Sequence, residues 1–235
     1  MNRGFKFNGK HSYTDYGLAL ESKKIGSPAK QKIKETVPFM DGSYDFSTLG
    51  SNGQQVFAER PIEIVIGLPT KSKEQLHILY SKVLTWLVDV GEQQLVFDDI
   101  ANYYFLAEVE SAPDFEEMIR FGKLKVTFTA QPFKKCVEYE GDKVWDTFDF
   151  NNDILQEAEF NVAGSRTVSV INGGRIVIPT FNASATNMTI VFGGKTYSLV
   201  VGDNKIYDIK FPSGVNSITL NGTGTITVLL RKETL

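Results

Sequence analysis

One stretch of the chain, residues 72–91, has apolar side chains at helical spacing. Ser72 and Gln75, three positions apart, form a capping box at its start, and Gly91 follows its last apolar residues. The apolar positions fall on one face of a helix: Leu76, Leu79, Tyr80, Val83, Leu84 and Leu87. This pattern predicts an amphipathic helix packed on a core, with His77 on its exposed side.

Segments on both sides of this helix alternate between apolar and polar residues, which is typical of β-strands with one buried face. In residues 55–67 the alternation involves Ile62, Ile64 and Ile66. Further strands are predicted at residues 94–98, 103–109 and 124–129. Together with the helix, these strands predict an α+β domain that spans residues 1–133.

The composition changes after a charged, aperiodic segment, residues 134–143, which we interpret as a linker. Residues 144–235 contain no helical pattern and consist of short Val-, Ile- and Thr-rich runs between Gly- and Asn-containing turns. Strands are predicted at 167–171, 175–178, 189–192, 197–201, 206–209, 218–220 and 226–230. The sequence therefore predicts a mainly β chain of two domains, the second a β-sandwich.

Residues 21–35 are polar, rich in turn formers and mixed in charge. Ile25 and Ile33 flank a plausible turn in this segment. Two interpretations stay open: a mobile surface loop, or a protruding hairpin arm that a partner holds in place.

Composition and charge exclude several classes of partner. The chain has 235 residues, of which 42% are hydrophobic, a net charge of −3 and a pI near 5.5. Because it lacks a basic field, nucleic acid and anionic membrane are not expected to bind. Cys136 is the single cysteine and cannot form an internal disulfide. No apolar run approaches the roughly eighteen residues of a membrane span, so a soluble protein made in the cytosol is expected.

No catalytic, cofactor-binding or metal-binding constellation is apparent in the sequence. Asp98 and Asp99 are adjacent, so on a strand they would point to opposite faces rather than face each other across a substrate. His11 and His77 are the two histidines, and each has a structural explanation. We therefore expect a protein that is not an enzyme and needs no cofactor.

Several short motifs occur in an order that resembles the phage distal tail protein family. The central ones are Leu-Val-Phe-Asp-Asp at 95–99 and Tyr-Tyr-Phe-Leu-Ala at 103–107, which follow a helix ending near Trp86-Leu87. Others lie at 5–9 (Phe-Lys-Phe-Asn-Gly), 16–18, 41–45, 60–64 and 126–132. The order and spacing of these motifs, rather than any single one, carry the resemblance, which covers residues 5–133.

The resemblance implies a structural hub at the distal end of a phage tail. Proteins of that family form hexameric rings through their N-terminal domains and carry a galectin-like or carbohydrate-module-like second domain. The expected partners are further copies of the chain, the tail tube protein, a tail-associated lysin or tail-tip hub protein, and a receptor-binding protein. The expected location is the virion, after assembly in the cytoplasm of the host bacterium.

Exposure and strand pattern suggest where subunits would meet. We expect contacts at the arm and at sheet edges near residues 60–67 and 121–130, because an edge strand can add a strand from a neighbour. The candidate contact residues are Lys23, Lys24, Ile25, Ile33, Ile62, Ile64, Val126 and Phe128.

A second hypothesis is a carbohydrate-binding module that adheres to the host cell surface through the C-terminal domain. Sugar rings stack on exposed aromatic faces, and the candidates for this role are Trp145, Tyr197 and Tyr207. A third hypothesis, a tail-associated lysin, needs a catalytic centre for which the sequence offers no residues.

Overall fold

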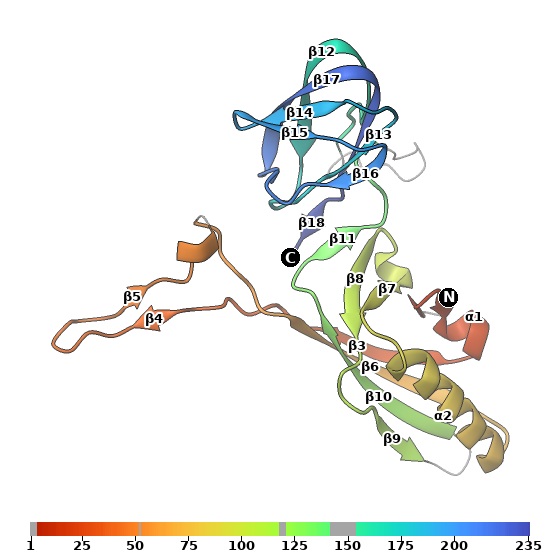
Figure 1. The fold of residues 1–235 in the computed structure, drawn as a ribbon. Helices are drawn as coiled ribbons and strands as arrows, with labels where there is room; N and C mark the ends of the chain where they lie inside the picture. Colours follow the sequence, from red (N-terminus) through yellow and green to blue (C-terminus); the bar gives the residue numbers. More distant parts are fainter. Residues whose placement is uncertain (1–3, 52, 118–120, 142–153) are drawn as a thin grey trace. The chain divides into compact units, whose positions relative to one another are not determined.

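The computed structural model describes residues 4–51, 53–117, 121–141 and 154–235. Within these ranges the chain forms two compact units, one ending at Lys134 and joined by Leu235, the other Lys135–Thr234. Figure 1 shows that strands dominate both units and that helices are confined to the first. The expectation of a mainly β chain with an α+β N-terminal part is confirmed.

The first unit is built on an antiparallel sheet with the strand order β2-β1-β7-β8-β10-β6-β3, and β9 pairs with β10. The strands are β1 (Phe5–Phe7), β2 (Lys10–His11), β3 (Ala19–Ile25), β6 (Arg60–Pro69), β7 (Gln93–Phe97), β8 (Tyr103–Glu108), β9 (Asp114–Glu117) and β10 (Phe121–Ala130). A short helix, α1 (Ser12–Tyr16), follows β2. β6 pairs with β10 on one side and with β3 on the other, so it is an interior strand.

Helix α2 (Lys73–Val88) covers one face of this sheet (Figure 1). The hydroxyl of Ser72 accepts a hydrogen bond from the Gln75 amide, which confirms the predicted N-cap. Val83, Trp86 and Leu87 of the helix are buried in the same core as Phe5 and the inward side chains of β6 and β10. Burial of the apolar face holds the helix, because propensity alone would leave an isolated helix marginal in water.

The second unit is entirely β in the residues that the structure describes. Its sheet has the order β15-β14-β17-β13-β16, and β12 pairs with β17 along its length. The strands are β12 (Glu159–Asn172), β13 (Thr180–Ala183), β14 (Thr189–Phe192), β15 (Lys195–Ser198), β16 (Gly202–Lys205) and β17 (Gly214–Leu229), with a short pair β11 (Lys134–Cys136) and β18 (Glu233–Thr234). Inward residues such as Phe181 and Phe211 form one core, as in a β-sandwich.

Strand β17 joins the two predicted strands 218–220 and 226–230, which the sequence separates by a turn at Asn221-Gly222. The chain does not turn there, because Gly222 and Gly224, with φ of 120° and 148°, bend a continuous strand instead. The half of β17 before the bend pairs with β14, and the half after it pairs with β13. A side chain at Gly222 would place its Cβ 3.1 Å from the Met188 Cα, so the glycine permits a close approach between strands.

The segment interpreted as a linker, residues 134–143, begins with a short strand: Lys134–Cys136 form β11, and the Cys136 amide donates to the Lys232 carbonyl at 2.9 Å. The predicted strands at 175–178 and 206–209 were wrong. Residues 175–178 contribute a single bridge, between Val177 and Phe211, and residues 206–209 form a turn after β16.

Candidate assembly surface

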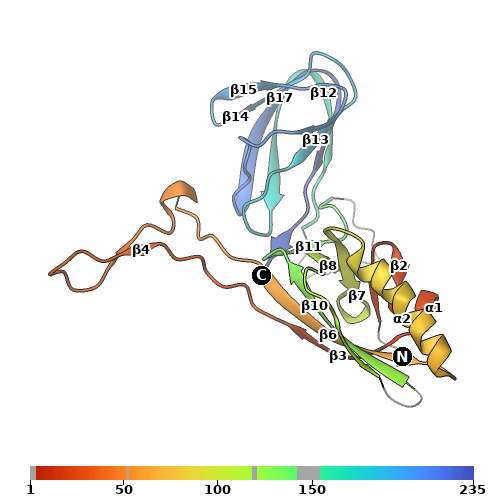
Figure 2. The same ribbon diagram turned by 60° about the horizontal axis from the view of Figure 1, so that its bottom comes forward.

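A long hairpin projects from the first unit, and we call residues 26–59 the arm. Figures 1 and 2 both show it leaving the sheet where β3 ends and returning where β6 begins. The amide of Gly26 donates to the Pro61 carbonyl at 2.8 Å, at the root of the arm. A Cβ at Gly26 would lie 2.7 Å from that carbonyl oxygen, so only glycine fits at this crossing.

Backbone hydrogen bonds continue from the root along the arm. Gln31 donates to Val56, and Ala58 donates to Ala29. Further out, the short strands β4 (Lys34–Glu35) and β5 (Tyr44–Asp45) pair, and a 3-10 turn, η1 (Leu49–Ser51), follows β5. The arm is therefore a two-stranded ribbon, which is the hairpin form of the two interpretations that the sequence left open. It is longer than the predicted segment 21–35.

The carboxylate of Asp45 fastens the two strands of the arm to each other. It accepts hydrogen bonds from the Lys32 ammonium at 2.8 Å and from the Ser47 amide at 2.9 Å. The Ser47 hydroxyl in turn accepts from the Ile33 amide at 2.8 Å. The hydrogen bond from Lys32, with those from Ser47, holds the pKa of Asp45 well below its usual value of 3.8.

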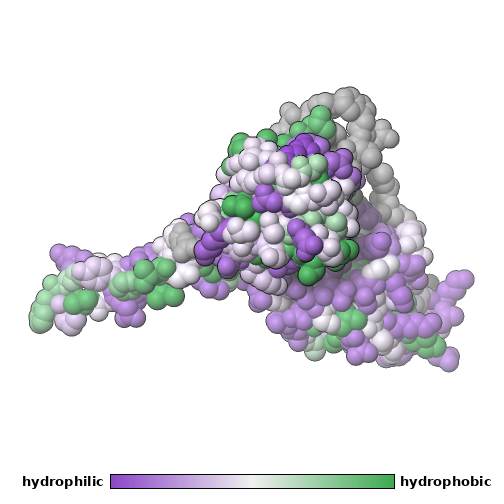
Figure 3. Space-filling model, turned by 45° about the horizontal axis from the view of Figure 1, so that its top comes forward, coloured by the Kyte–Doolittle hydropathy of each residue, from purple (hydrophilic) through white to green (hydrophobic). Residues whose placement is uncertain are grey.

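The outer part of the arm exposes a set of large apolar side chains to solvent. Leu49 and Ile33 have 79% and 59% of their surface exposed, and Phe39 at the tip is fully exposed. The complete set is Ile33, Val37, Phe39, Tyr44, Phe46, Leu49 and Val56. Figure 3 shows hydrophobic patches distributed along the arm. Apolar surface that a subunit leaves uncovered is common at sites of protein–protein interaction.

The tip of the arm has an unusual backbone conformation. Val37 and Met40 close a turn, in which the Met40 amide donates to the Val37 carbonyl at 3.2 Å. Pro38 and Phe39 occupy its centre, and Phe39 has a φ of +65°. A turn with proline first and positive φ second normally has glycine at the second place. A bulky residue there is strained, and strain of this kind is a reason to look for a function.

The predicted contact residues at the root of the arm lie on the edge strand β3. Lys23 forms an ion pair with Asp99, and its ammonium lies 4.5 Å from the centre of the Phe97 ring. Lys24 is exposed at 4.0 Å from a Glu63 oxygen, and Ile25 is half-buried against the core. Among the described strands β3 pairs only with β6, so its outer edge is open for strand addition.

Four of the predicted contact residues cannot meet a neighbour. Ile62, Ile64, Val126 and Phe128 are fully buried in the core of their own subunit. Their strands, β6 and β10, also have partners on both sides and are not sheet edges. The alternating pattern correctly predicted a buried face, but it does not tell an interior strand from an edge strand.

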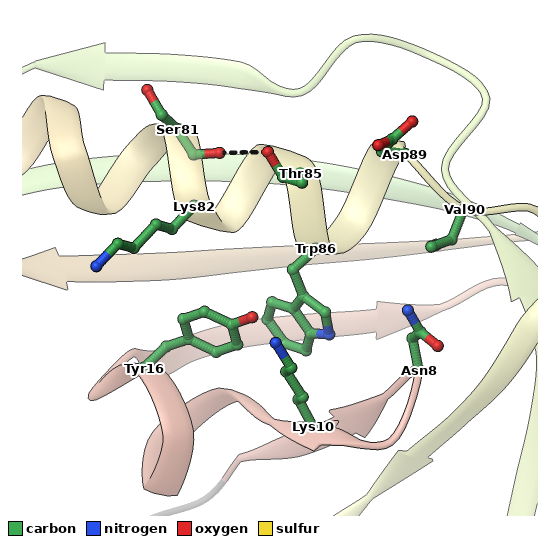
Figure 4. Close-up of a pocket in the computed structure, with 9 residues that line it drawn as sticks. All are labelled: Asn8, Lys10, Tyr16, Ser81, Lys82, Thr85, Trp86, Asp89 and Val90. Atoms are coloured by element: carbon green, nitrogen blue, oxygen red, sulfur yellow. Dashed lines mark hydrogen bonds between the residues drawn. The ribbon is translucent and has the colours of Figure 1, made fainter.

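A hollow of about 610 Å³ lies between the first strands and helix α2 (Figure 4). Its wall is formed by the rings of Tyr16 and Trp86, stacked at 4.7 Å and 22°. The Lys10 ammonium lies 5.6 Å from the centre of the Tyr16 ring. We call this hollow the groove; it is lined by Asn8, Lys10, Tyr16, Ser81, Lys82, Thr85, Trp86, Asp89 and Val90. The groove is not apparent from the sequence, because its residues come from segments more than sixty positions apart.

The acidic pair and the histidine beside it have structural roles. Asp98 accepts hydrogen bonds from the Gly4 amide at 2.7 Å and pairs with the His11 ring at 3.0 Å. The other ring nitrogen of His11 accepts from amides at the start of α1. Asp98 and Asp99 begin a 3-10 turn, η2 (Asp98–Ile100), rather than extending a strand. No group of residues suited to hold a metal occurs in the described ranges.

The predicted sugar-stacking residues differ in their surroundings. Tyr207 is 68% exposed, with the Lys205 ammonium 5.7 Å from its ring centre. Tyr197 is half-buried and packs against the core of the second unit. Trp145 lies outside the described residues. A hollow of about 330 Å³ in the same unit is lined by Lys135, Ile176, Val177, Ile178, Lys205, Lys210 and Glu233.

No helix within the described ranges is long and apolar enough to cross a membrane.

The fold is similar to that of a solved phage tail protein. The distal tail protein Dit (gp 19.1) of phage SPP1, described as a paradigm of the hub adsorption apparatus in phages that infect Gram-positive bacteria, matches with a TM-score of 0.64. The match covers 99% of each chain at 14% sequence identity. Chains of the phage p2 baseplate in its activated conformation, with strontium or with calcium, match at TM-scores of 0.42 and identities of 8% and 9%. These matches cover 96% and 99% of this chain and 97% and 98% of those chains.

The sequence comparison agrees on the first unit. No curated protein matches the chain significantly. The family model of the phage tail protein RIFT-related domain matches residues 8–130, which is more than half of the chain and lies within the segment that carried the motif resemblance. The chain belongs to the family of phage tail proteins with a RIFT-related domain.

Proposed function

We propose that this protein is a structural hub at the distal end of a phage tail, where copies of the chain join into a hexameric ring. The arm is the observation that carries the proposal. It is an ordered ribbon with seven large apolar side chains exposed, which a free monomer would leave in water. Copies that cover one another's arms bury this surface and gain the hydrophobic free energy of association.

The first unit forms the ring in this proposal, and the second unit is displayed from it. The ring joins the tail tube on one side and the tail-associated lysin or tail-tip hub protein and the receptor-binding protein on the other. Its role is to hold proteins together rather than to catalyse a reaction, and it acts in the virion after assembly in the host cytoplasm. The open edge of β3, with Lys23 and Lys24, adds a second surface at which a subunit or tail protein docks.

Native mass spectrometry of the purified chain, with negative-stain images, tests the proposal. A closed hexamer has about six times the 26.2 kDa mass of the chain, roughly 157 kDa. A ring-shaped particle of this mass supports the hub. A protein that stays at 26.2 kDa at every concentration contradicts ring formation by the chain itself.

A second candidate function, binding of cell-surface carbohydrate by the second unit, is supported by Tyr207. Its exposed ring and the neighbouring Lys205, which lines the 330 Å³ hollow, offer a stacking face beside hydrogen-bond donors. Binding of the full chain to purified cell-wall polysaccharide, lost in Tyr207→Ala, supports this function. Equal binding by the variant would show that Tyr207 is not part of the carbohydrate-binding site.

A further inference from the structure

The tip of the arm and the groove lie at opposite ends of the first unit. Figures 1 and 2 both show the arm extending away from the side of the unit where α1, α2 and the first strands gather. We infer that the arm tip, with Phe39 at its end, docks in the groove of a second copy of this chain. This inference rests on the proposed ring and names the surface that receives each arm.

The tip has the composition of a docking element. Residues 36–43 contain a single charged residue, Asp41. It is exposed, as are the nearby Val37, Pro38 and Phe39. Phe39 combines a fully exposed ring with a positive φ, two features that each cost free energy in an isolated subunit. Docking in the groove offsets both costs, because it removes the ring from water and fixes the turn.

The backbone bonds and the Asp45 carboxylate hold the arm in its extended form before it meets a partner. A preformed hairpin loses less conformational entropy on binding than a flexible loop does. The exposed tip therefore has a defined position on the subunit before it binds.

The groove has the matching chemistry. Tyr16, half-buried and stacked on the buried Trp86, gives the groove an aromatic surface against which a phenyl ring packs edge-on or offset. Two lysines, Lys10 and Lys82, and one carboxylate, Asp89, line the same hollow. This excess of positive charge favours an acidic side chain such as that of Asp41. Its volume of about 610 Å³ lies within the range of about 300–1,000 Å³ in which compact ligands are bound.

The positions of tip and groove explain why the occupant is a second copy. The arm of a subunit points away from that subunit's own groove, so the two cannot meet within one chain (Figures 1 and 2). When different surfaces of identical subunits pair head to tail, each subunit gives one contact and receives one, and the series closes as a ring when the rotation between neighbours is a whole fraction of a turn. Every tip and every groove is then filled.

Phe39→Gly tests the docking without damaging the arm. Glycine adopts the φ of +65° at position 39 without strain, so the hairpin turn is kept while the ring is lost. The concentration at which the wild-type ring half-assembles, followed by native mass spectrometry and mass photometry, should rise about 30-fold or more in this variant. The control is Leu155→Ala, which removes a large exposed apolar side chain from the second unit, outside the arm and the groove, and should change the midpoint less than about threefold.

A charge exchange tests the partner of Asp41. Asp41→Lys and Lys82→Glu should each weaken assembly about 3- to 10-fold, and the double variant should regain most of the loss, because the pair is restored with its signs reversed.

The outcomes separate this inference from the proposed function. If the wild type forms rings and Phe39→Gly assembles at the same concentration, docking in the groove is overturned. The hub proposal then still stands. Wild type that stays monomeric overturns the ring on which the inference rests. A double charge variant no stronger than the weaker single variant overturns the placement of Asp41 beside Lys82.

Discussion

Trp86 donates its indole N–H to the backbone carbonyl of Phe7 at 2.9 Å, which ties helix α2 to the first strand across 79 positions of the sequence. The Trp86 ring also stacks on Phe5 at 5.5 Å and on Tyr16 at 4.7 Å. One side chain therefore supports the core on one side and the wall of the groove on the other. Stability of the first unit and recognition at the groove depend on the same residue.

Trp86→Phe should destabilise the first unit by ~2 kcal/mol, from the lost buried hydrogen bond and the smaller stacked area. The measurement is urea unfolding of the full chain followed by circular dichroism. Tyr80→Phe is the control: it removes one polar group from the same helix and keeps the ring stack with Phe115 at 4.1 Å. An unchanged unfolding midpoint for Trp86→Phe would contradict the role of the indole N–H.

Ile64→Asp should prevent the first unit from folding. Ile64 is 1% exposed between its strand neighbours, and an unpaired carboxylate there costs more than about 4 kcal/mol. Glu63→Gln, the neighbouring residue on the opposite face of β6, should change stability by less than about 1 kcal/mol. Circular dichroism and limited proteolysis compare the two variants. A folded Ile64→Asp would show that this face of β6 is not enclosed.

Local sequence patterns predicted which helix and strands the first unit contains better than they predicted which strands pair with each other. The spacing of Leu76, Val83 and Leu87 and the capping pair Ser72 and Gln75 predicted helix α2, because both signals are short-range. The order of strands depends on long-range pairing. Alternation in β6 therefore gave its buried face but not its interior position, and the expected sheet edges were wrong.

The arm departs from the ordinary inside-outside pattern, which limited what the sequence could predict. Tyr44, Phe46 and Leu49 would normally be read as core residues, since large apolar side chains are mostly buried. In this chain they are exposed on the returning strand of the arm. A sequence alone wrongly predicts such residues as core when the surface that buries them belongs to a partner protein.

Gly222→Ala should destabilise the second unit by ~1–3 kcal/mol, because alanine at a φ of 120° is strained and its methyl group meets the Met188 backbone at 3.1 Å. Gly193→Ala provides a comparison in open space, since no heavy atom lies within 4 Å of its added Cβ. Thermal unfolding by calorimetry measures both variants. Equal effects would mean that the bend in β17 does not depend on the close approach.

Asp45→Ala should loosen the arm while the rest of the first unit stays folded. Hydrogen exchange of the amides of Ile33, Phe46 and Ser47 should become faster, because the carboxylate that ties Lys32 to Ser47 is gone. Glu35→Ala, an acidic residue of the same hairpin, serves as the control. Unchanged protection in Asp45→Ala would show that the backbone bonds alone hold the arm.

The same carboxylate makes the arm sensitive to acid in a defined direction. The pKa of Asp45 is lowered in the folded arm, so its contribution is fully present above the usual aspartate pKa of 3.8 and is lost only as the pH falls through the lowered value. Exchange of the Ser47 amide, corrected for its intrinsic pH dependence, should stay protected at pH 4. Loss of protection between pH 5 and pH 4 would contradict a lowered pKa.

Replacement of residues 30–57 by a short Asn-Gly turn should remove the ring and leave the subunit folded. The cut lies outside β3 and β6, and the root bond between Gly26 and Pro61 is kept. A deletion of residues 23–32 would instead remove part of β3 together with one strand of the arm, so its effect on assembly could not be separated from damage to the sheet. Native mass spectrometry reports assembly, and circular dichroism reports folding. Rings that persist in the folded, armless variant would show that subunits join through β3 or another surface, and that the exposed arm serves a different tail protein.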